Sequence, residues 1–287
     1  MRLENDLSDP VLTSRNLTVA AIQFEPRIGD RAFNLAAIDR MVRRAASEGA
    51  DLVVLPELAD TGYLFQSTTE LSTLAESVPG GTSVRFLASL SRDLAIHIVC
   101  GLAERDGDIF YNAAILTGPE GYLGKYRKLH LWNDENRYFA PGNLGLPVFD
   151  IGIGKVGIAI CYDGWFPEVF RQLALNGAEL ICVPTNWVPM PGSESQDDTM
   201  SNILTKAAAH SNGVHIVCAD RIGTERGQPF IGRSLIVGPD GWPLAGPASA
   251  DREEVLLAAI DLSSVPQSRI LNSFNHLLGD RRTDVYR

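Results

Sequence analysis

The sequence predicts an α/β protein, a four-layer αββα sandwich of two mixed sheets related by a pseudo-twofold internal repeat. Two observations lead to this prediction. Short apolar segments rich in Val and Ile alternate with helix-like segments, which is typical of sheets covered by helices. The second half of the chain also repeats the first, so each half is expected to supply one sheet with helices on one face.

In the first half, predicted strands and helices alternate along the chain. Residues 31–48 predict a helix that is ended by Gly49. The segment "DIFYNAAILTGPEGYLGKYRKLH" (108–130) predicts a β-hairpin, because residues 118–121 have the composition of a turn. The other predicted elements of this half are strands at 17–24, 51–56 and 97–102 and a helix at 82–94.

Three segments of the second half match segments of the first half in the same order. The matching pairs are "GADLVVLPE" (49–57) with "GAELICVPT" (177–185), "HIVC" at 97–100 with "HIVC" at 215–218, and "ILTGPEGYLG" (115–124) with "LIVGPDGWPL" (235–244). Chance explains one apolar match but not three in order. The repeat therefore predicts two similar sheets that pack together.

We expect a single domain over residues 1–287, because no linker rich in Pro, Ser or Gly separates the two halves. The core of this domain is expected to span about residues 17–262. The tail at 263–287 breaks the strand pattern, and we expect it to contact a neighbouring part of the chain or a partner subunit.

The composition excludes several classes of function. The chain has 25 Lys and Arg against 35 Asp and Glu, a formal charge of −10, whereas binding to nucleic acid needs a basic surface. No segment reaches the roughly 18 apolar residues of a membrane helix, and the polar N-terminus lacks the apolar region of a signal peptide. We therefore expect a cytoplasmic protein without nucleic-acid or membrane partners.

The four cysteines lack the close spacing of a zinc site or a redox dithiol. Cys100, Cys182 and Cys218 lie inside apolar runs and are predicted to be buried thiols, a usage that suits a reducing cytoplasm. Cys161 differs, because it ends the strand-like run at 156–160 and a helix-like segment begins a few residues later.

Glu57, Lys128 and Cys161 each end a predicted strand. Ligand sites of α/β sheets lie beyond the carboxyl ends of the strands, so these side chains are expected to converge. Taken singly, each has an ordinary alternative as a loop carboxylate, a solvated lysine or a core thiol. Together they suffice for covalent acyl transfer, with a carboxylate as base for the thiol. The Lys128 ammonium and the main-chain N–H of Tyr162 would stabilise the oxyanion.

Three blocks of the sequence resemble the signatures of the nitrilase superfamily, the carbon–nitrogen hydrolases. They are "LPE" (55–57), "KLHLWNDENRYFAPG" (128–142) and "CYDGWFPE" (161–168). The resemblance covers about residues 17–261, including the order and spacing of the blocks. It implies the αββα sandwich, no metal or organic cofactor, and a homo-oligomer, since members of this family usually form dimers or larger assemblies.

The resemblance also implies roles for individual residues. Cys161 would be the nucleophile, Glu57 the general base and Lys128 the oxyanion stabiliser. Glu135 would be a fourth functional residue that orients the substrate and assists proton transfer. His130 belongs to the same block and is expected to order the loop that carries Glu135.

The residues after the cysteine distinguish the branches of this superfamily. Nitrilases tend to have Trp-Glu there and N-carbamoyl amino acid hydrolases have Arg, whereas this chain has Tyr162, Asp163, Gly164 and Trp165. We therefore expect an amidase that cleaves a small aliphatic primary amide through a thioester. A nitrilase, an N-carbamoyl amine or amino acid amidohydrolase, and a binding or regulatory member without turnover stay open as alternatives. A member without turnover would be expected to have lost one of the four functional residues.

Six residues near these strand ends are expected to contact the small-molecule substrate: Tyr63, Asn112, Trp132, Tyr162, Asn186 and Trp187. For Trp187, a place as an aromatic cover over the core is an equal alternative. The acidic stretch at 193–198 is interpreted as a solvated loop before a helix, with attraction of an amine-bearing amide as the alternative. A metal site at His130, Asp134 and Glu135 is disfavoured, because their spacing suits no familiar site.

Overall fold

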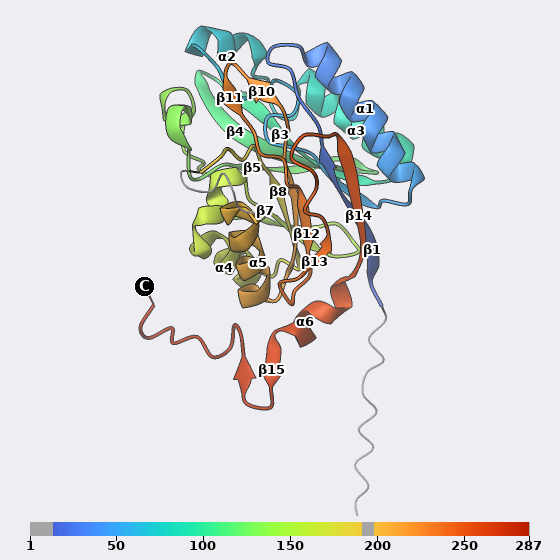
Figure 1. Cartoon of the computed structure of the whole chain (residues 1–287), viewed down its shortest axis with the longest axis vertical. Helices are drawn as coiled ribbons and strands as arrows, with labels where there is room; N and C mark the ends of the chain where they lie inside the picture. Colours follow the sequence, from blue (N-terminus) through green and yellow to red (C-terminus); the bar gives the residue numbers. More distant parts are fainter. Residues whose placement is uncertain (1–13, 191–197, 287) are drawn as a thin grey trace, which may run out of the picture.

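Two six-stranded sheets pack face to face in the computed structural model, which describes residues 14–190 and 198–286 (Figure 1). The first sheet has the order β14-β1-β2-β3-β4-β5, and its strands are, in that order, Glu254–Asp261, Asn16–Gln23, Leu52–Val54, His97–Asp106, Ile109–Gly118 and Gly121–Arg127. The second has the order β13-β12-β9-β8-β7-β6, and its strands are Pro243–Ala245, Leu235–Val237, His215–Ala219, Leu180–Pro184, Lys155–Ile158 and Val148–Asp150.

The two sheets follow one pairing pattern, as the sequence repeat predicts. Counted from β14 in the first sheet and from β6 in the second, neighbouring strands pair antiparallel, parallel, parallel, antiparallel and antiparallel. The matched segments also have the same register. Leu52 lies opposite His97 in the first sheet, and Leu180 lies opposite His215 in the second.

The expectation that each half supplies a whole sheet is wrong at one edge. β14 comes from the C-terminal half but pairs with β1 over its full length, from Asn16 opposite Asp261 to Gln23 opposite Glu254. The physical reason is that this edge of β1 would otherwise leave a row of main-chain N–H and C=O groups without partners. The last long strand therefore ties the second half of the chain to the first sheet.

Helices cover the outer face of each sheet (Figure 1). The first sheet is covered by α1 (Arg31–Ser47) and α3 (Thr82–Leu94), and the second by α4 (Pro167–Leu175) and α5 (Met200–Asn212). The N-terminus of α1 is fixed by Asp30, whose side chain accepts a hydrogen bond from Phe33 N at 3.0 Å. The helices predicted at 31–48 and 82–94 are thus confirmed to within one residue.

The smaller elements lie at the ends of the sandwich and after it. They are α2 (Thr68–Leu74), β10 (Thr224–Glu225), β11 (Gln228–Pro229), α6 (Val265–Ser268), β15 (Ile270–Asn272), β16 (Asn275–His276) and three 3-10 turns, η1 (Asn133–Arg137), η2 (Cys161–Trp165) and η3 (Leu262–Ser264). Across the two described ranges, no helix is long and apolar enough to cross a membrane.

The solvated loop predicted at the acidic stretch 193–198 lies outside the described residues except for Asp198. This residue forms an ion pair with Lys206. The following helix α5 is capped by Thr199, whose hydroxyl accepts from Asn202 N at 3.4 Å. A helix does follow this stretch, but its cap, expected just before Thr199, is Thr199 itself.

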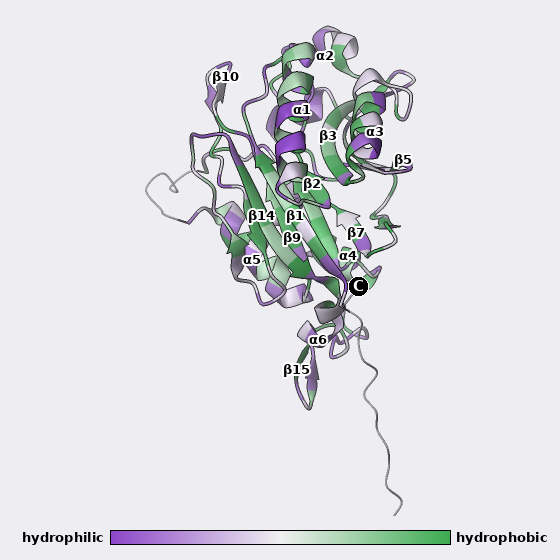
Figure 2. Ribbon diagram, turned by 90° about the vertical axis from the view of Figure 1, so that its right-hand side faces the viewer, coloured by the Kyte–Doolittle hydropathy of each residue, from purple (hydrophilic) through white to green (hydrophobic). Residues whose placement is uncertain are grey.

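Alternate residues of the central strands face two different layers. Ile22 and Val53 pack with the helices α1 and α3, whereas Val19 and Val54 pack with the second sheet. Both faces of these strands are therefore apolar, which explains the continuous Val- and Ile-rich runs of the sequence. Figure 2 shows this apolar colouring on the strands between the helix layers.

The C-terminal tail leaves the sandwich after η3 and forms the hairpin β15–β16 (Figure 1). The side chain of Phe274 at its turn is 91% exposed, and Leu271 is 53% exposed. Contact of this tail with a partner subunit stays a prediction.

Gly101 of β3 packs closely against the main chain of the residues that follow β2. A Cβ at this position would lie 2.5 Å from Glu57 Cα and 2.7 Å from Leu58 N, so the main chain after β2 would have to move. We expect Gly101→Ala to lower the free energy of unfolding by about 1–3 kcal/mol, as overpacking of a close-packed core does. Urea denaturation measures this.

The control is Gly80→Ala, whose added methyl group would meet only the side chain of Ser77, at 3.2 Å. This variant should unfold like the wild-type protein. Equal unfolding curves for the Gly80 and Gly101 variants would contradict the close approach of β3 to the main chain at Glu57.

Candidate active site

Cys161 is the first residue of η2, three residues after β7 ends at Ile158. Its φ is +46°, a left-handed conformation that is uncommon for a residue other than glycine and that often marks a functional turn. The residue is only 6% exposed. After η2 the chain enters α4, with Pro167 in its first turn, as the sequence predicts.

The carboxylate of Asp163 holds the turn that carries the thiol. Its Oδ2 accepts hydrogen bonds from Ile160 N at 3.0 Å and from the Tyr126 hydroxyl at 2.8 Å. Its Oδ1 accepts from His130 N at 3.0 Å and lies 2.8 Å from His130 Nδ1. Because Tyr126 lies in β5 and His130 follows it, one buried carboxylate joins the turn after β7 to the loop after β5.

His130 therefore orders its loop, as expected, and it does so through Asp163. The imidazole also stacks on the ring of Phe166, with 3.6 Å between the ring centroids. The residue before α4 and the loop after β5 are thus in direct contact.

Glu57 follows β2 and is fully buried. Its Oε1 accepts hydrogen bonds from Lys128 Nζ at 2.7 Å and from Asn112 Nδ2 at 2.6 Å. Its Oε2 has no hydrogen-bond partner in the part of the chain that the structure describes. One oxygen of this carboxylate is therefore fixed, and the other is available.

Lys128 directly follows β5 and is also fully buried. Its Nζ lies 2.7 Å from Glu57 Oε1 and 2.7 Å from Glu135 Oε1, so the ammonium bridges two carboxylates. Its main-chain N–H donates to Asn112 O at 2.8 Å. Asn112 thus holds both the lysine, through its main chain, and Glu57, through its side chain.

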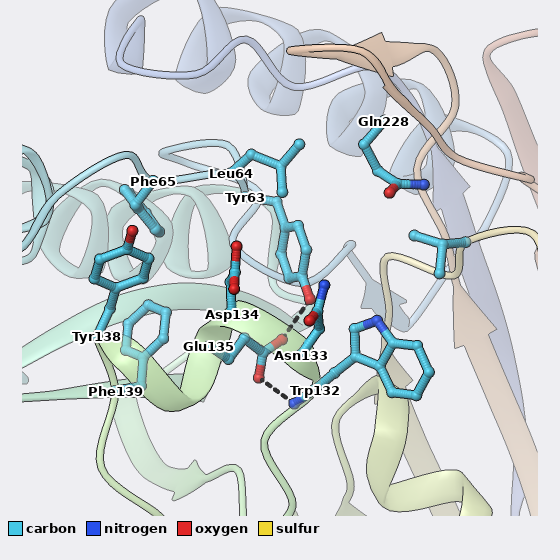
Figure 3. Close-up of a pocket in the computed structure, with 11 residues that line it drawn as sticks. Tyr63, Leu64, Phe65, Trp132, Asn133, Asp134, Glu135, Tyr138, Phe139 and Gln228 are labelled. Carbon is cyan, nitrogen blue, oxygen red and sulfur yellow. Dashed lines mark hydrogen bonds between the residues drawn. The ribbon is translucent and has the colours of Figure 1, made fainter.

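Glu135 lies in η1 and faces a pocket that Figure 3 shows. Besides Lys128, its Oε1 accepts a hydrogen bond from the Tyr63 hydroxyl at 2.6 Å, and its Oε2 accepts from Trp132 N at 3.1 Å (Figure 3). The structure therefore brings Glu57 together with Lys128 and Glu135, from which it is far apart in the sequence.

Burial and charge shift the pKa of each group in this cluster. Burial is the main reason that the pKa of Glu57 rises to about 7; the Lys128 ammonium opposes this rise, and Glu135 adds to it. Burial and the Glu57 carboxylate raise the pKa of the Cys161 thiol well above its usual value. Burial lowers the pKa of Lys128, but the Glu135 and Glu57 carboxylates outweigh it, so the net shift is upward and the ammonium stays charged.

A cavity beside the thiol collects most of the predicted substrate-contact residues. It is lined by Trp132, Cys161, Tyr162, Trp165, Asn186, Trp187, Val188 and Met190. Trp132 and Val188 also line the pocket of Figure 3, so the two cavities adjoin. Tyr63 lines that neighbouring pocket.

Asn112 is placed differently from the other five predicted contact residues. It is 1% exposed, and its side-chain amide donates to Glu57. This position behind the carboxylate gives it a part in orienting Glu57.

Two residues that support the site were not predicted from the sequence. One is Asp163, which served in the sequence only to distinguish the branches of the superfamily. The other is Glu225, whose Oε1 accepts from Tyr63 N at 2.9 Å and from Leu64 N at 2.6 Å, and which pairs with Arg221 at 2.8 Å. The only local signal for this pair is two opposite charges four residues apart.

The metal interpretation of His130, Asp134 and Glu135 finds no support in the described residues, among which no group of three or more His, Cys, Asp or Glu side chains is placed to hold a metal ion. The carboxylate of Glu135 faces the Lys128 ammonium instead.

An αββα sandwich with a buried thiol, an ammonium and two carboxylates near the carboxyl ends of its strands has the architecture of a hydrolase. The chain belongs to the carbon–nitrogen hydrolase family, because the model of that family matches residues 18–270. It is therefore an enzyme of the nitrilase superfamily that acts on carbon–nitrogen bonds.

Three similar proteins illustrate the range of the family. A nitrilase of Pyrococcus abyssi is 44% identical, over 93% of this chain and 98% of its own length. The N-carbamoylputrescine amidase of Solanum lycopersicum is 35% identical, over 96% of this chain and 95% of its own. The crystal structure of an amidase from Nesterenkonia sp. has a TM-score of 0.77 at 28% identity, covering 94% of this chain and 95% of its own. A variant of that amidase shows covalent addition of the acetamide moiety of fluoroacetamide at its active-site cysteine.

The pH dependence of Cys161 alkylation tests the role of Glu57. Glu57 accepts a proton only when it is ionised, so the rate of alkylation by iodoacetamide should rise with pH through about 7. In Glu57→Gln this inflection should be absent, and the rate should stay low until the thiol itself ionises at higher pH. Mass spectrometry measures the label at Cys161.

Labelling of the buried thiols Cys100, Cys182 and Cys218 provides the internal reference, because these residues lie in the apolar core. An inflection near pH 7 that survives in Glu57→Gln would show that another group controls the thiol.

Replacement of Asp163 by Asn tests its part in holding the turn. The amide oxygen cannot accept all the hydrogen bonds that the two carboxylate oxygens accept, so at least one buried donor loses its partner. We expect the free energy of unfolding to fall by about 2–4 kcal/mol, and Cys161 to be alkylated at least about tenfold more slowly than in the wild type. Urea denaturation and labelling measure the two effects.

The exposed Asp251 provides the matched control, since Asp251→Asn makes the same chemical change on the surface. It should change neither quantity. A stable Asp163→Asn protein with wild-type labelling would contradict the role assigned to this carboxylate.

Proposed function

We propose that this enzyme hydrolyses small, uncharged aliphatic primary amides to a carboxylic acid and ammonia, through a thioester on Cys161. One observation carries the proposal. Glu57 keeps one oxygen fixed by Lys128 and Asn112, while its other oxygen has no partner among the described residues and its charge acts on the buried thiol. Its pKa of about 7 suits a group that must take up and return a proton near neutral pH.

In the first step, Cys161 Sγ attacks the amide carbon while the thiol proton moves to Glu57. The carbonyl oxygen becomes an oxyanion, which the Lys128 ammonium and the main-chain N–H of Tyr162 stabilise. When the intermediate collapses, the carbon–nitrogen bond breaks and Glu57 returns the proton to the departing NH₂ group. Ammonia leaves, and the acyl group remains on sulfur as a thioester.

In the second step, a water molecule attacks the thioester carbon and gives one proton to Glu57. The carbon–sulfur bond breaks, and the thiol of Cys161 recovers this proton. The sum of the two steps is amide plus water to carboxylic acid plus ammonia, and the enzyme returns to its starting state.

Glu135 supports both steps through Lys128. A buried ammonium beside a single carboxylate could lose its proton to that carboxylate, but a second carboxylate on the other side keeps it charged. The Tyr63 hydroxyl and Trp132 N hold Glu135 in place.

The cavity beside the thiol supports a neutral acyl group. The described residues that line it are aromatic, aliphatic or amide side chains in addition to the thiol, with Trp132, Tyr162, Trp165 and Trp187 as the largest. No arginine stands among them, whereas recognition of a substrate carboxylate usually relies on one. This supports a simple amide over an N-carbamoyl amino acid.

An N-carbamoyl amine is the second candidate substrate. Its carbamoyl end presents the same CO–NH₂ group to Cys161, and aromatic walls such as those of Trp165 and Trp187 attract a cationic amine. The N-carbamoylputrescine amidase of S. lycopersicum is similar along almost its whole length.

Ammonia release from a panel of substrates tests the proposed function. The panel comprises propionamide, a longer aliphatic amide, 5-aminopentanamide, an N-carbamoyl amine and the matching nitriles. We expect turnover of the uncharged amides, because they fit the uncharged cavity. Cys161→Ala should fold but retain less than about one per cent of this activity, since Cys161 is the one thiol among the described residues that line the cavity.

Turnover restricted to the N-carbamoyl amine would favour the second candidate. Turnover restricted to nitriles would contradict the proposed function. Substantial activity of Cys161→Ala would contradict covalent catalysis by this residue.

A further inference from the structure

Asn186 lies two residues after β8 and lines the cavity that contains Cys161. It is 2% exposed. Its Nδ2 donates a hydrogen bond to the main-chain oxygen of Glu57 at 2.9 Å. This bond fixes the orientation of the side-chain amide, because the nitrogen is the end that must face a carbonyl oxygen.

The other end of this amide is unpaired. Asn186 Oδ1 is buried and has no hydrogen-bond partner among the described residues, and the same holds for Glu57 Oε2. An unpaired buried acceptor is costly and rare, so two of them on hydrogen-bonded residues near one thiol need an explanation. A ligand that brings N–H donors would satisfy both.

Unpaired polar atoms of both kinds lie at the site, since the described residues leave Trp187 Nε1, a donor, without a partner as well as the two acceptors. The Lys128 ammonium provides positive charge for an oxyanion. Asn186 Oδ1 acts only as a hydrogen-bond acceptor, and Glu57 Oε2 does so as well when Glu57 is ionised. A primary amide has the complementary pattern, with an acceptor oxygen on one side and two N–H donors on the other. This pattern orients the NH₂ group towards Glu57 and Asn186.

We propose that Asn186 determines specificity for the leaving group: its Oδ1 accepts one N–H of the departing NH₂ group, and Glu57 Oε2 faces the other. This rests on the proposed function and deepens it. A leaving group without N–H donors, such as an alkoxide or phenoxide, leaves Asn186 Oδ1 unpaired. A nitrile is also disfavoured, because attack of the thiol on its carbon places negative charge on its nitrogen, which would lie beside two acceptors.

The test compares an amide with an ester of the same acid. The enzyme is given the best amide of the panel and the p-nitrophenyl ester of the same carboxylic acid, so both substrates form the same thioester. In Asn186→Leu, we expect the ratio of kcat/KM for the amide to kcat/KM for the ester to fall about 10–100-fold. An unchanged ratio would overturn the inference, even if both values fall, because the residue would then act only by positioning Glu57.

Two further variants separate recognition from structure. Asn186→Asp keeps an acceptor oxygen and loses the donor to Glu57 O, so it should retain an amide-to-ester ratio within about threefold of the wild type whatever its absolute rates. This variant also keeps the test decisive if Asn186→Leu does not fold. A fall of about 10–100-fold in the amide-to-ester ratio of Asn186→Asp would overturn the inference. Trp187→Phe alters the same cavity and should change both substrates by a similar factor.

The wild-type protein alone distinguishes failure of the proposed function from failure of this inference. If it hydrolyses no member of the panel that carries a CO–NH₂ group, the proposed function is overturned before any Asn186 variant is compared. If it hydrolyses such a substrate and the ratio is unaffected in Asn186→Leu, only the inference is overturned.

Discussion

The site depends on one interaction, the bridge that the buried Lys128 ammonium makes between Glu57 and Glu135. Glu57 and Lys128 are fully buried and Glu135 is almost fully buried, so each charge depends on the other two. The bridge holds the ammonium in its charged state and leaves one oxygen of Glu57 without a partner among the described residues. The electrostatics of the thiol follow from this arrangement, because Cys161 lies in the field of the same three groups.

The sheets explain how such a cluster can form at all. Glu57 and Lys128 come from the ends of β2 and β5 in the first sheet, while Cys161 comes from the end of β7 in the second. Close packing of the two sheets therefore sets the distance between Glu57 and Cys161. Asp163 fixes this arrangement locally, because its carboxylate binds both the turn that carries Cys161 and the loop after Lys128.

The sequence was sufficient for what depends on local pattern or on repetition. Continuous apolar runs and the helix patterns predicted the layers, and the matched segments predicted the common register of β2–β3 and β8–β9. Residues at strand ends predicted the cluster. The crossing of β14, the role of Asp163 and the Glu225 support of Tyr63 were not predictable, because each joins segments whose proximity appears only when the sheets are assembled.

The position of β14 has a consequence for how the protein is made. On a ribosome, β1 is synthesised first, but its partner along one edge is complete only when Asp261 has emerged. The first sheet is incomplete until then, so the newly made chain carries an unpaired strand edge for most of its synthesis. Contacts between such distant segments also slow folding. The enzyme thus gains its final form late, and a chain truncated before β14 would be prone to aggregate.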